Sequence, residues 1–346
     1  SLISLSMHNM NRLLSIVWDY STYWRLTFHP GKCSLLVFGR HQNGNNVAKL
    51  GPNVIQQKAG EMHVGIPLGR HNDFVKQTVC KSKRKFFSLL GLGSLTGGLC
   101  PLMASKLYWS FSMSKLLYGC QVIDYTHCET EQMEISHREI GRRIQALPKS
   151  SPNPIAIAGL GWLSIKRQID FTRLMFSWSI VILPMNNIYK TVLIHRLLWL
   201  IGGNGRHNSP LSIMWETLER YNLNNMVFKM IESGEFLCKS AFKRLVSGII
   251  RCKEAHSVIM MCSLYDSLTM FVPTVRSFMQ PNLWWNISKK RPILNKKCIL
   301  MFKLQTRCYP FDICALCPLC SKENDTLEHF LLRCDALSHE RHTLTM

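Results

Sequence analysis

The sequence predicts a mainly α-helical protein with a small β component, and three observations indicate this class. Apolar residues recur at helical spacing from residue 73 to residue 147 and again from 155 to 275. The segments with the β-branched and aromatic content of strands are short and lie before residue 70. A hydrophobic content of 47% in a chain of 346 residues is ample for a core.

The first seventy residues are expected to combine one helix with short strands. Residues 1–20 predict a helix whose apolar side chains share one face: Leu13, Leu14, Val17 and Trp18. Residues 33–39 (CSLLVFG) have the composition of a buried strand, and the turn-forming HPGK precedes it. Residues 61–69 (EMHVGIPLG) predict a second extended segment.

The rest of the chain is expected to be helical up to its last seventy residues. The first helical region is broken at the Gly-rich residues 91–101 and ends at Pro148, where residues 149–154 (KSSPNP) predict a linker. The second region is interrupted at residues 202–210 (GGNGRHNSP) and contains no internal repeat.

The charge balance points to a polyanionic partner. The chain has 42 Lys and Arg against 21 Asp and Glu, a net charge of +21 and a pI of about 9.6. Such a field attracts nucleic acid, although an anionic membrane surface or a ribosome-like assembly fits the charge equally well. Fourteen Cys spread over a long basic chain without a signal peptide indicate reduced thiols inside the cell. The apolar stretch Leu174 to Leu200 is interrupted by Pro184 and polar residues, so no transmembrane segment is expected.

The sharpest motif lies near the C-terminus, in CPLCSKENDTLEHFLLRC. It places Cys317, Cys320, His329 and Cys334 in a C-x2-C-x8-H-x4-C spacing. Two thiolates from one tight turn and two ligands from a short helix can complete a tetrahedron, and four protein ligands leave no open position. We therefore expect one structural zinc. The alternative is a set of ordinary buried thiols, and Cys314 is a competing ligand.

A basic helical stretch, residues 75–91, is the second motif. Its cations precede the pair Phe86 and Phe87, and they are Lys76, Lys81, Lys83, Arg84 and Lys85. Cations suit a phosphate backbone, and an adjacent ring can stack on a base or sugar. The alternative is a solvated helix face over a core formed by the two Phe. With Lys106 and Lys115 further along the chain, these cations are expected to bind RNA and DNA duplexes with weak sequence preference.

The sequence contains no motif of an independent active site. The glycines of GLGSLTGGL (residues 91–99) match neither a Walker A loop nor a dinucleotide fingerprint, so a turn between helices is expected there. Neither a nucleophile elbow nor a His-Glu-x-x-His pair occurs.

Two early segments carry a resemblance to a known family. In residues 21–39 (STYWRLTFHPGKCSLLVFG) the matching positions are Trp24, Phe28, His29-Pro30, Lys32, Cys33 and Phe38-Gly39. This pattern resembles the end of the palm in reverse transcriptases of non-LTR (LINE-like) retrotransposons, with His29 where the family usually has Asn. Residues 63–69 (HVGIPLG) resemble the family's primer-grip segment, with His63 and Val64 in place of Tyr-Leu.

Later segments resemble the same family in the same order. Residues 117–119 (LYG) and 159–168 (GLGWLSIKRQ) are similar to its thumb and post-thumb, and the terminal Cys/His cluster resembles its zinc knuckle. The resemblance implies a fragment of an RNA-directed DNA polymerase that binds a template–primer duplex, with the nucleus as the site of the parent activity. It also implies four regions: a palm remnant (1–70), a helical thumb (71–150), a helical connector (151–275), and a basic segment with the CCHC zinc knuckle (276–346).

The catalytic part of the family pattern is not found in this chain. The family's Asp-Asp box, which holds two magnesium ions in the intact parent enzyme, is expected to end just before Ser1, and no Asp-Asp pair occurs in the chain. The chain is therefore expected to be truncated at its start and inactive by itself. Lys32 resembles a family Lys that protonates pyrophosphate, the alternative being a solvated turn lysine. A non-enzymatic zinc-knuckle protein that binds nucleic acid is the alternative function.

Overall fold

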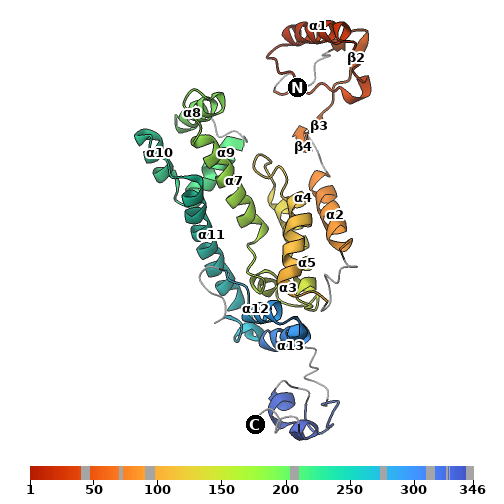
Figure 1. Cartoon of the computed structure of the whole chain (residues 1–346), viewed down its shortest axis with the longest axis vertical. Coiled ribbons are helices and arrows are strands. Elements are labelled where there is room, and N and C mark those ends of the chain that lie inside the picture. Colours follow the sequence, from red (N-terminus) through yellow and green to blue (C-terminus); the bar gives the residue numbers. More distant parts are fainter. Residues whose placement is uncertain are drawn as a thin grey trace. The chain divides into compact units, whose positions relative to one another are not determined.

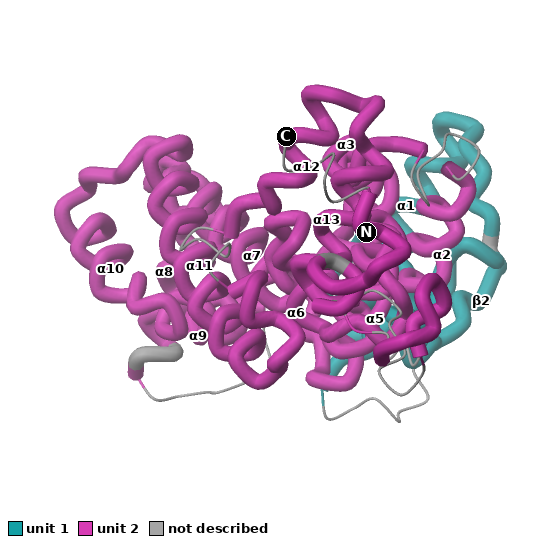
Figure 2. Tube along the Cα trace, turned by 90° about the horizontal axis from the view of Figure 1, so that it is seen from below, with its two compact units in different colours: residues 1–77 teal, residues 78–346 magenta. Residues whose placement is uncertain are grey.

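A computed structural model describes most of the chain as two compact units, residues 1–77 and 78–346 (Figure 2). The described residues are 1–39, 47–69, 73–89, 98–202, 210–272, 279–308, 316–324, 326 and 328–339. They form mainly helices with two small two-stranded sheets, which confirms the predicted fold class. None of the described helices is long and apolar enough to cross a membrane. Most of the Gly-rich turn expected at 91–98 lies outside the described residues.

The first unit packs one helix against two short strands. Its elements are α1 (Met7–Tyr23), β1 (Ala48–Leu50), β2 (Asn53–Ile55), β3 (Gly60–His63) and β4 (Ile66–Gly69) (Figure 1). The side chain of Ser6 caps α1 by accepting a hydrogen bond from the backbone N–H of Asn9 at 3.2 Å. Leu14 packs with Leu50 in a small core, and the partly buried Val17 and Trp18 pack against it, so the predicted apolar face of this helix is confirmed.

The predictions of extended structure were right for one segment and wrong for the other. Residues 61–69 lie in the antiparallel hairpin β3–β4, which turns at Val64 and Gly65, both with positive φ. Residues 33–39 do not form a strand, and Leu35 alone makes a bridge, to Gln57. This bridge consists of two backbone hydrogen bonds to residues just after β2, from Leu35 N–H to the carbonyl of Gln56 at 3.0 Å and from Lys58 N–H to the carbonyl of Leu35 at 2.9 Å.

The second unit is helical. Its helices, of which the first crosses the boundary between the units, are α2 (Phe74–Phe87), α3 (Pro101–Leu107), α4 (Ser114–Leu116), α5 (His127–Ile144), α6 (Asn153–Ala158), α7 (Ile165–Val181), α8 (Ile188–Ile201), α9 (Pro210–Arg220), α10 (Asn224–Ser233), α11 (Lys239–Cys262), α12 (Leu283–Lys290) and α13 (Asn295–Gln305) (Figure 1). These helices confirm the predicted helical regions on both sides of residue 150.

A buried stack of rings joins the helices before residue 150 to those after it. Tyr108, from the π-helical turn Tyr108–Met113, stacks on Trp162 with ring centroids 4.8 Å apart, and Trp162 stacks on His137 of α5 at 4.7 Å. The imidazole also bonds to the Tyr108 hydroxyl and to the carbonyl of Leu163. Burial lowers the pKa of His137, because the charged imidazolium is poorly solvated there, so the ring is neutral at ordinary pH. Both nitrogens of the neutral ring have hydrogen-bond partners.

Helices α7 to α11 form a second apolar cluster. Trp178 of α7 lies parallel to Phe242 of α11, with ring centroids 4.0 Å apart. On the same helix, the buried carboxylate of Asp170 accepts hydrogen bonds from Arg220 at 2.8 Å and Tyr221 at 2.9 Å, so its charge is paired. Packing of α7 against both α5 and α11 places it at the centre of the helical unit.

The predicted linker at residues 149–154 is wrong, because this segment turns directly into the buried helix α6. Gly141 of α5 faces the backbone carbonyl of Ala156, and a β-carbon at that position would collide with it. Nearby, the Gln145 side-chain amide donates to three carbonyls, those of Gly141 at 3.0 Å, Ile155 at 3.3 Å and Ala156 at 2.9 Å. The backbones of α5 and α6 are therefore in direct contact and are linked by the Gln145 side chain.

Replacing Gly141 by Ala tests this close approach. In an unobstructed helix the change adds up to about 1 kcal/mol of stability, but overpacking against the fixed backbone of Ala156 costs about 1–3 kcal/mol. We expect Gly141→Ala to lower the free energy of unfolding, measured by urea denaturation. Gly248→Ala in α11 is the matched control, because nothing lies within 4 Å of its added methyl, and it should stabilise the protein. Equal effects of the two changes would contradict the packing described.

Candidate metal centre

The turn that carries the first two cysteines is closed by backbone hydrogen bonds. The N–H of Cys317 donates to the carbonyl of Glu323 at 2.8 Å, and the N–H of Ser321 donates to the carbonyl of Cys317 at 2.8 Å. Leu316 and Asn324 form an antiparallel bridge just outside this turn. The chain therefore folds back over a few residues and points both thiols to the same side.

The other two ligands come from a π-helical turn, His329–Arg333. In an α-helix, side chains five residues apart lie about 140° apart around the axis and diverge. Here the N–H of Cys334 donates to the carbonyl of His329 at 2.7 Å, which is the i to i+5 bond of a π-turn. This wider turn brings both side chains to one side, where the sequence had predicted an ordinary short helix.

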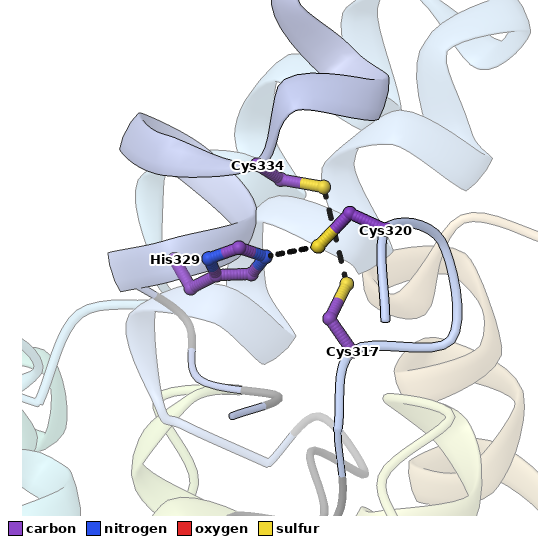
Figure 3. Close-up of side chains that lie close together, drawn as sticks. All are labelled: Cys317, Cys320, His329 and Cys334. Carbon is purple, nitrogen blue, oxygen red and sulfur yellow. Dashed lines mark hydrogen bonds between the residues drawn. The ribbon is translucent and has the colours of Figure 1, made fainter. Parts of the chain in front are cut away.

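The four side chains converge on one point (Figure 3). One ligand atom from each, Sγ of Cys317, Cys320 and Cys334 and a ring nitrogen of His329, lies within 4.8 Å of the others. The Sγ atoms of Cys317 and Cys334 are 3.9 Å apart, and Cys320 Sγ is 3.1 Å from His329 Nε2.

These distances fit a tetrahedral metal site. Zinc–sulfur bonds of about 2.3 Å at tetrahedral angles separate two sulfurs by about 3.7 Å, whereas a disulfide would require about 2.05 Å. Cys317, His329 and Cys334 are buried and Cys320 is half-buried, so four protein ligands close the site. The cluster predicted from the spacing is confirmed as a group that could hold a metal ion, compatible with structural zinc. Cys314 lies outside the described residues.

The surroundings of the cluster set its protonation. Hydrogen bonds from the backbone amides of Lys322 and Glu323 lower the pKa of the Cys320 thiol to about 7, which favours the thiolate that a metal requires. Burial raises the pKa of Cys334. The hydrogen bond to the Glu323 carboxylate raises the pKa of His329 to about 9.

Glu323 is a neighbour of the cluster that the sequence analysis missed. Its Oε2 lies 2.9 Å from His329 Nδ1, on the side of the ring away from Cys320. A metal ion that binds Nε2 would displace the proton from that nitrogen, while the proton on Nδ1 stays bonded to the carboxylate, the arrangement that orients many metal-bound imidazoles. The five residues between Glu323 and His329 gave no periodic signal for this contact.

The remaining side chains of the segment are exposed or only partly buried. Phe330 is half-buried, while Leu327 and the side chain of Leu331 lie outside the described residues. Two cations near the cluster form exposed ion pairs, Lys322 with Asp335 at 2.8 Å and Arg333 with Glu328 at 2.7 Å. Pairs this exposed contribute little to stability and can open for another anion.

The basic stretch predicted to bind nucleic acid lies on α2. Its buried face consists of Val75, Thr78, Ser82 and Phe86, and Lys76, Lys81, Arg84 and Lys85 are exposed on the remaining faces. Lys83 is half-buried and pairs with Glu139 of α5 at 2.6 Å. These placements leave four of the five cations open to solvent.

The two Phe that follow these cations serve packing. Phe86 is fully buried and packs edge-on against Tyr108, so the expectation that it could stack on a base is wrong. Phe87 is half-buried, with the guanidinium of Arg143 4.9 Å from its ring centre. The alternative interpretation of this stretch placed the two Phe in a core beneath a solvated basic face, and it is correct for the buried Phe86.

The other predicted cations lie on other elements than α2. Lys106 is exposed on α3, and the half-buried Lys115 of α4 lies 5.8 Å from the ring centre of Tyr118. Lys32 is exposed in the short turn Pro30–Lys32 of the first unit. The sequence analysis also missed four cations that line one pocket of the helical unit, treated below, because they come from distant segments.

Comparisons with protein-family models, with curated proteins and with solved structures find no match to this chain. Its function is therefore inferred from its own residues, their charge and their placement.

Replacing Glu323 by Ala tests its role at the metal centre. Losing such a partner of a metal-bound imidazole usually weakens metal binding by about 10- to 100-fold. We expect a loss of this size in the zinc affinity of the full chain, measured by competition with a chromophoric chelator. Glu328→Ala is the matched control, because Glu328 is a nearby exposed carboxylate that pairs with Arg333, and its affinity should match that of the parent. An unchanged affinity for Glu323→Ala would exclude this role.

Proposed function

We propose that this chain binds nucleic acid and that it is the part of a non-LTR retrotransposon reverse transcriptase that follows the catalytic aspartates. The nucleic-acid part rests on one observation, the exposed cations of α2. Lys81, Arg84 and Lys85 form no ion pair with any described residue, in a chain of net charge +21. Neutralising phosphates releases their counterions, which favours binding of a polyanion to such a surface.

The Cys3His cluster supports the same proposal in a structural role. With no open coordination position, a zinc ion there would supply folding free energy and no catalysis. The family part of the proposal rests on the order of the resembling segments: the palm end at 21–39, the primer grip at 63–69, the thumb segments at 117–119 and 159–168, and the knuckle at 317–334. In the intact parent, magnesium ions would be held upstream, and the partner would be a template–primer duplex in the nucleus.

A non-enzymatic protein that uses the same surfaces is the second candidate, and the closed Cys3His cluster, which leaves no open coordination position, supports it as well. The two candidates differ in the nucleic acid they prefer. A polymerase segment should favour an RNA–DNA hybrid with a recessed primer end over single-stranded RNA of the same length. A zinc-knuckle protein without a polymerase origin should bind both nucleic acids with similar affinity.

Charge reversal on α2 tests the binding surface. We expect the triple variant Lys81→Glu, Arg84→Glu, Lys85→Glu to bind a fluorescent RNA–DNA hybrid at least about tenfold more weakly, with a shallower salt dependence, because three phosphate contacts are lost. Lys83 is left intact because it pairs with Glu139. Fluorescence anisotropy across a salt series measures both quantities.

The control carries the same charge change elsewhere on the helical unit. Lys229→Glu, Lys243→Glu and Arg244→Glu alter exposed positions of α10 and α11. If this control weakens binding as much as the α2 variant, net charge and not the α2 surface governs the interaction. If the parent chain shows no salt-dependent binding at all, the proposed function is wrong.

A second prediction concerns catalysis by the chain itself. Two magnesium ions in a polymerase require paired carboxylates, and the sequence has no Asp-Asp pair to hold them. Primer extension on a homopolymer RNA template, with magnesium or manganese, should give no incorporation above a heat-treated sample. Heat-sensitive incorporation by the purified chain would contradict the assignment of its residues to the region after the catalytic box.

A further inference from the structure

A basic pocket opens in the helical unit where the ends of three helices meet. It has a volume of about 840 Å³ and is lined by the C-terminal end of α5, the turn into α6, the residues after α11 and the C-terminal end of α13. Four cations line it, Arg142, Lys149, Lys303 and Arg307. None of its described lining residues is acidic.

The cations in this pocket have no carboxylate partner among the described residues. Arg142 donates to the backbone carbonyl of Ser151 at 3.0 and 3.1 Å and to the Asn153 side chain at 2.5 Å, all neutral groups. Lys149, Lys303 and Arg307 form no ion pair with any residue that the structure describes. On α2 and α5, by contrast, Lys83 and Arg143 share the carboxylate of Glu139.

The helix ends around the pocket offset only part of this charge. After α5, Ala146 has a φ of 53°, and the N–H of Leu147 donates to the carbonyl of Arg142. After α13, Arg307 has a φ of 47°, and the N–H of Cys308 donates to the carbonyl of Lys303. Each C-terminal helix end carries about half a negative charge, so two ends contribute roughly −1 against four positive side chains. A net charge of roughly +3 remains, which an anion would neutralise.

The pocket frame is fixed before any ligand arrives. The Ser151 hydroxyl and N–H both bond to the carbonyl of Pro148, at 2.8 and 3.1 Å, and Arg142 is held by Ser151 and Asn153. The exposed ring of Tyr265 also lines the pocket, where it offers an apolar surface beside the cations. Cations, amide and hydroxyl donors beside an aromatic ring match a sugar-phosphate unit better than an isolated inorganic anion.

From this geometry we infer that the pocket is a second nucleic-acid contact, which takes the phosphodiester backbone of a strand through Lys149, Lys303 and Arg307. The inference rests on the proposed binding of nucleic acid and adds a site that is distinct from α2. Arg142 has a positioning role, because its bonds to Ser151 and Asn153 hold the turn that carries Lys149.

The test removes the three free cations and leaves the frame intact. In the full chain, Lys149→Gln, Lys303→Gln and Arg307→Gln should weaken binding of the RNA–DNA hybrid. They should also reduce the slope of log affinity against log salt by roughly 2 to 3 units, since each phosphate contact contributes about 0.7 to 0.9. The control Lys229→Gln, Lys243→Gln, Arg244→Gln removes the same charge from exposed positions and should leave the slope unchanged. Thermal melting checks that both variants fold.

The outcomes separate this inference from the proposed function. A parent chain that does not bind the hybrid overturns both. If the parent chain binds the hybrid but the pocket variant binds it as the control does, the inferred contact at the pocket is wrong and the proposed function stands. A second readout, acetylation of the exposed Lys149 followed by mass spectrometry, should show protection by the hybrid but not by inorganic phosphate at the same phosphate concentration. Equal protection by inorganic phosphate would assign the pocket to a free phosphate and overturn the strand contact.

Discussion

The helical unit depends on one close backbone approach, that of Gly141 in α5 to Ala156 in α6. Because no side chain separates the two helices, the six-residue α6 can be buried between longer ones, and the Gln145 amide satisfies the carbonyls exposed at this crossing. The residue after α6 contacts a third helix, since the carbonyl of Gly159 accepts a hydrogen bond at 2.9 Å from the N–H of Asn282, just before α12. Segments more than a hundred residues apart therefore meet around α6.

The helices of the second unit and the Cys/His segment are stabilised by different interactions. The helices of residues 98–305 are stabilised by burial of large side chains such as Trp178, Phe242 and Trp285. The segment around Cys317 and Cys334 has few apolar side chains to bury, and its ligands converge through turns and a π-helical bond. In such small segments metal binding supplies most of the folding free energy. If a zinc ion occupies the cluster, its removal would accordingly affect this segment first.

Electrostatics divides the cations of the helical unit into two groups. Some serve the fold: Lys83 and Arg143 share Glu139, Arg167 pairs with the buried Glu254, and Arg220 pairs with Asp170. Others have no carboxylate partner among the described residues, among them Lys81, Arg84 and Lys85 of α2 and Lys149, Lys303 and Arg307 of the basic pocket. Uncompensated cations repel one another and add nothing to folding. Under the proposed function, an anionic partner would neutralise them.

The sequence by itself determined the features that depend on neighbours in the chain. The helical class, the apolar face of α1 and the four ligands Cys317, Cys320, His329 and Cys334 follow from spacing, because a turn or a helix fixes the direction of nearby side chains. Only the tertiary structure decided what distant segments do to one another. Residues 33–39 form only a single bridge, to Gln57 just after β2. The expected linker at 149–154 leads into α6, which is buried because Gly141 lets it approach α5 closely. Phe86 lies in the core because Tyr108 covers it. The basic pocket was also decided by the tertiary structure, since Arg142 and Arg307 line one pocket only when α5 and α13 pack into one unit.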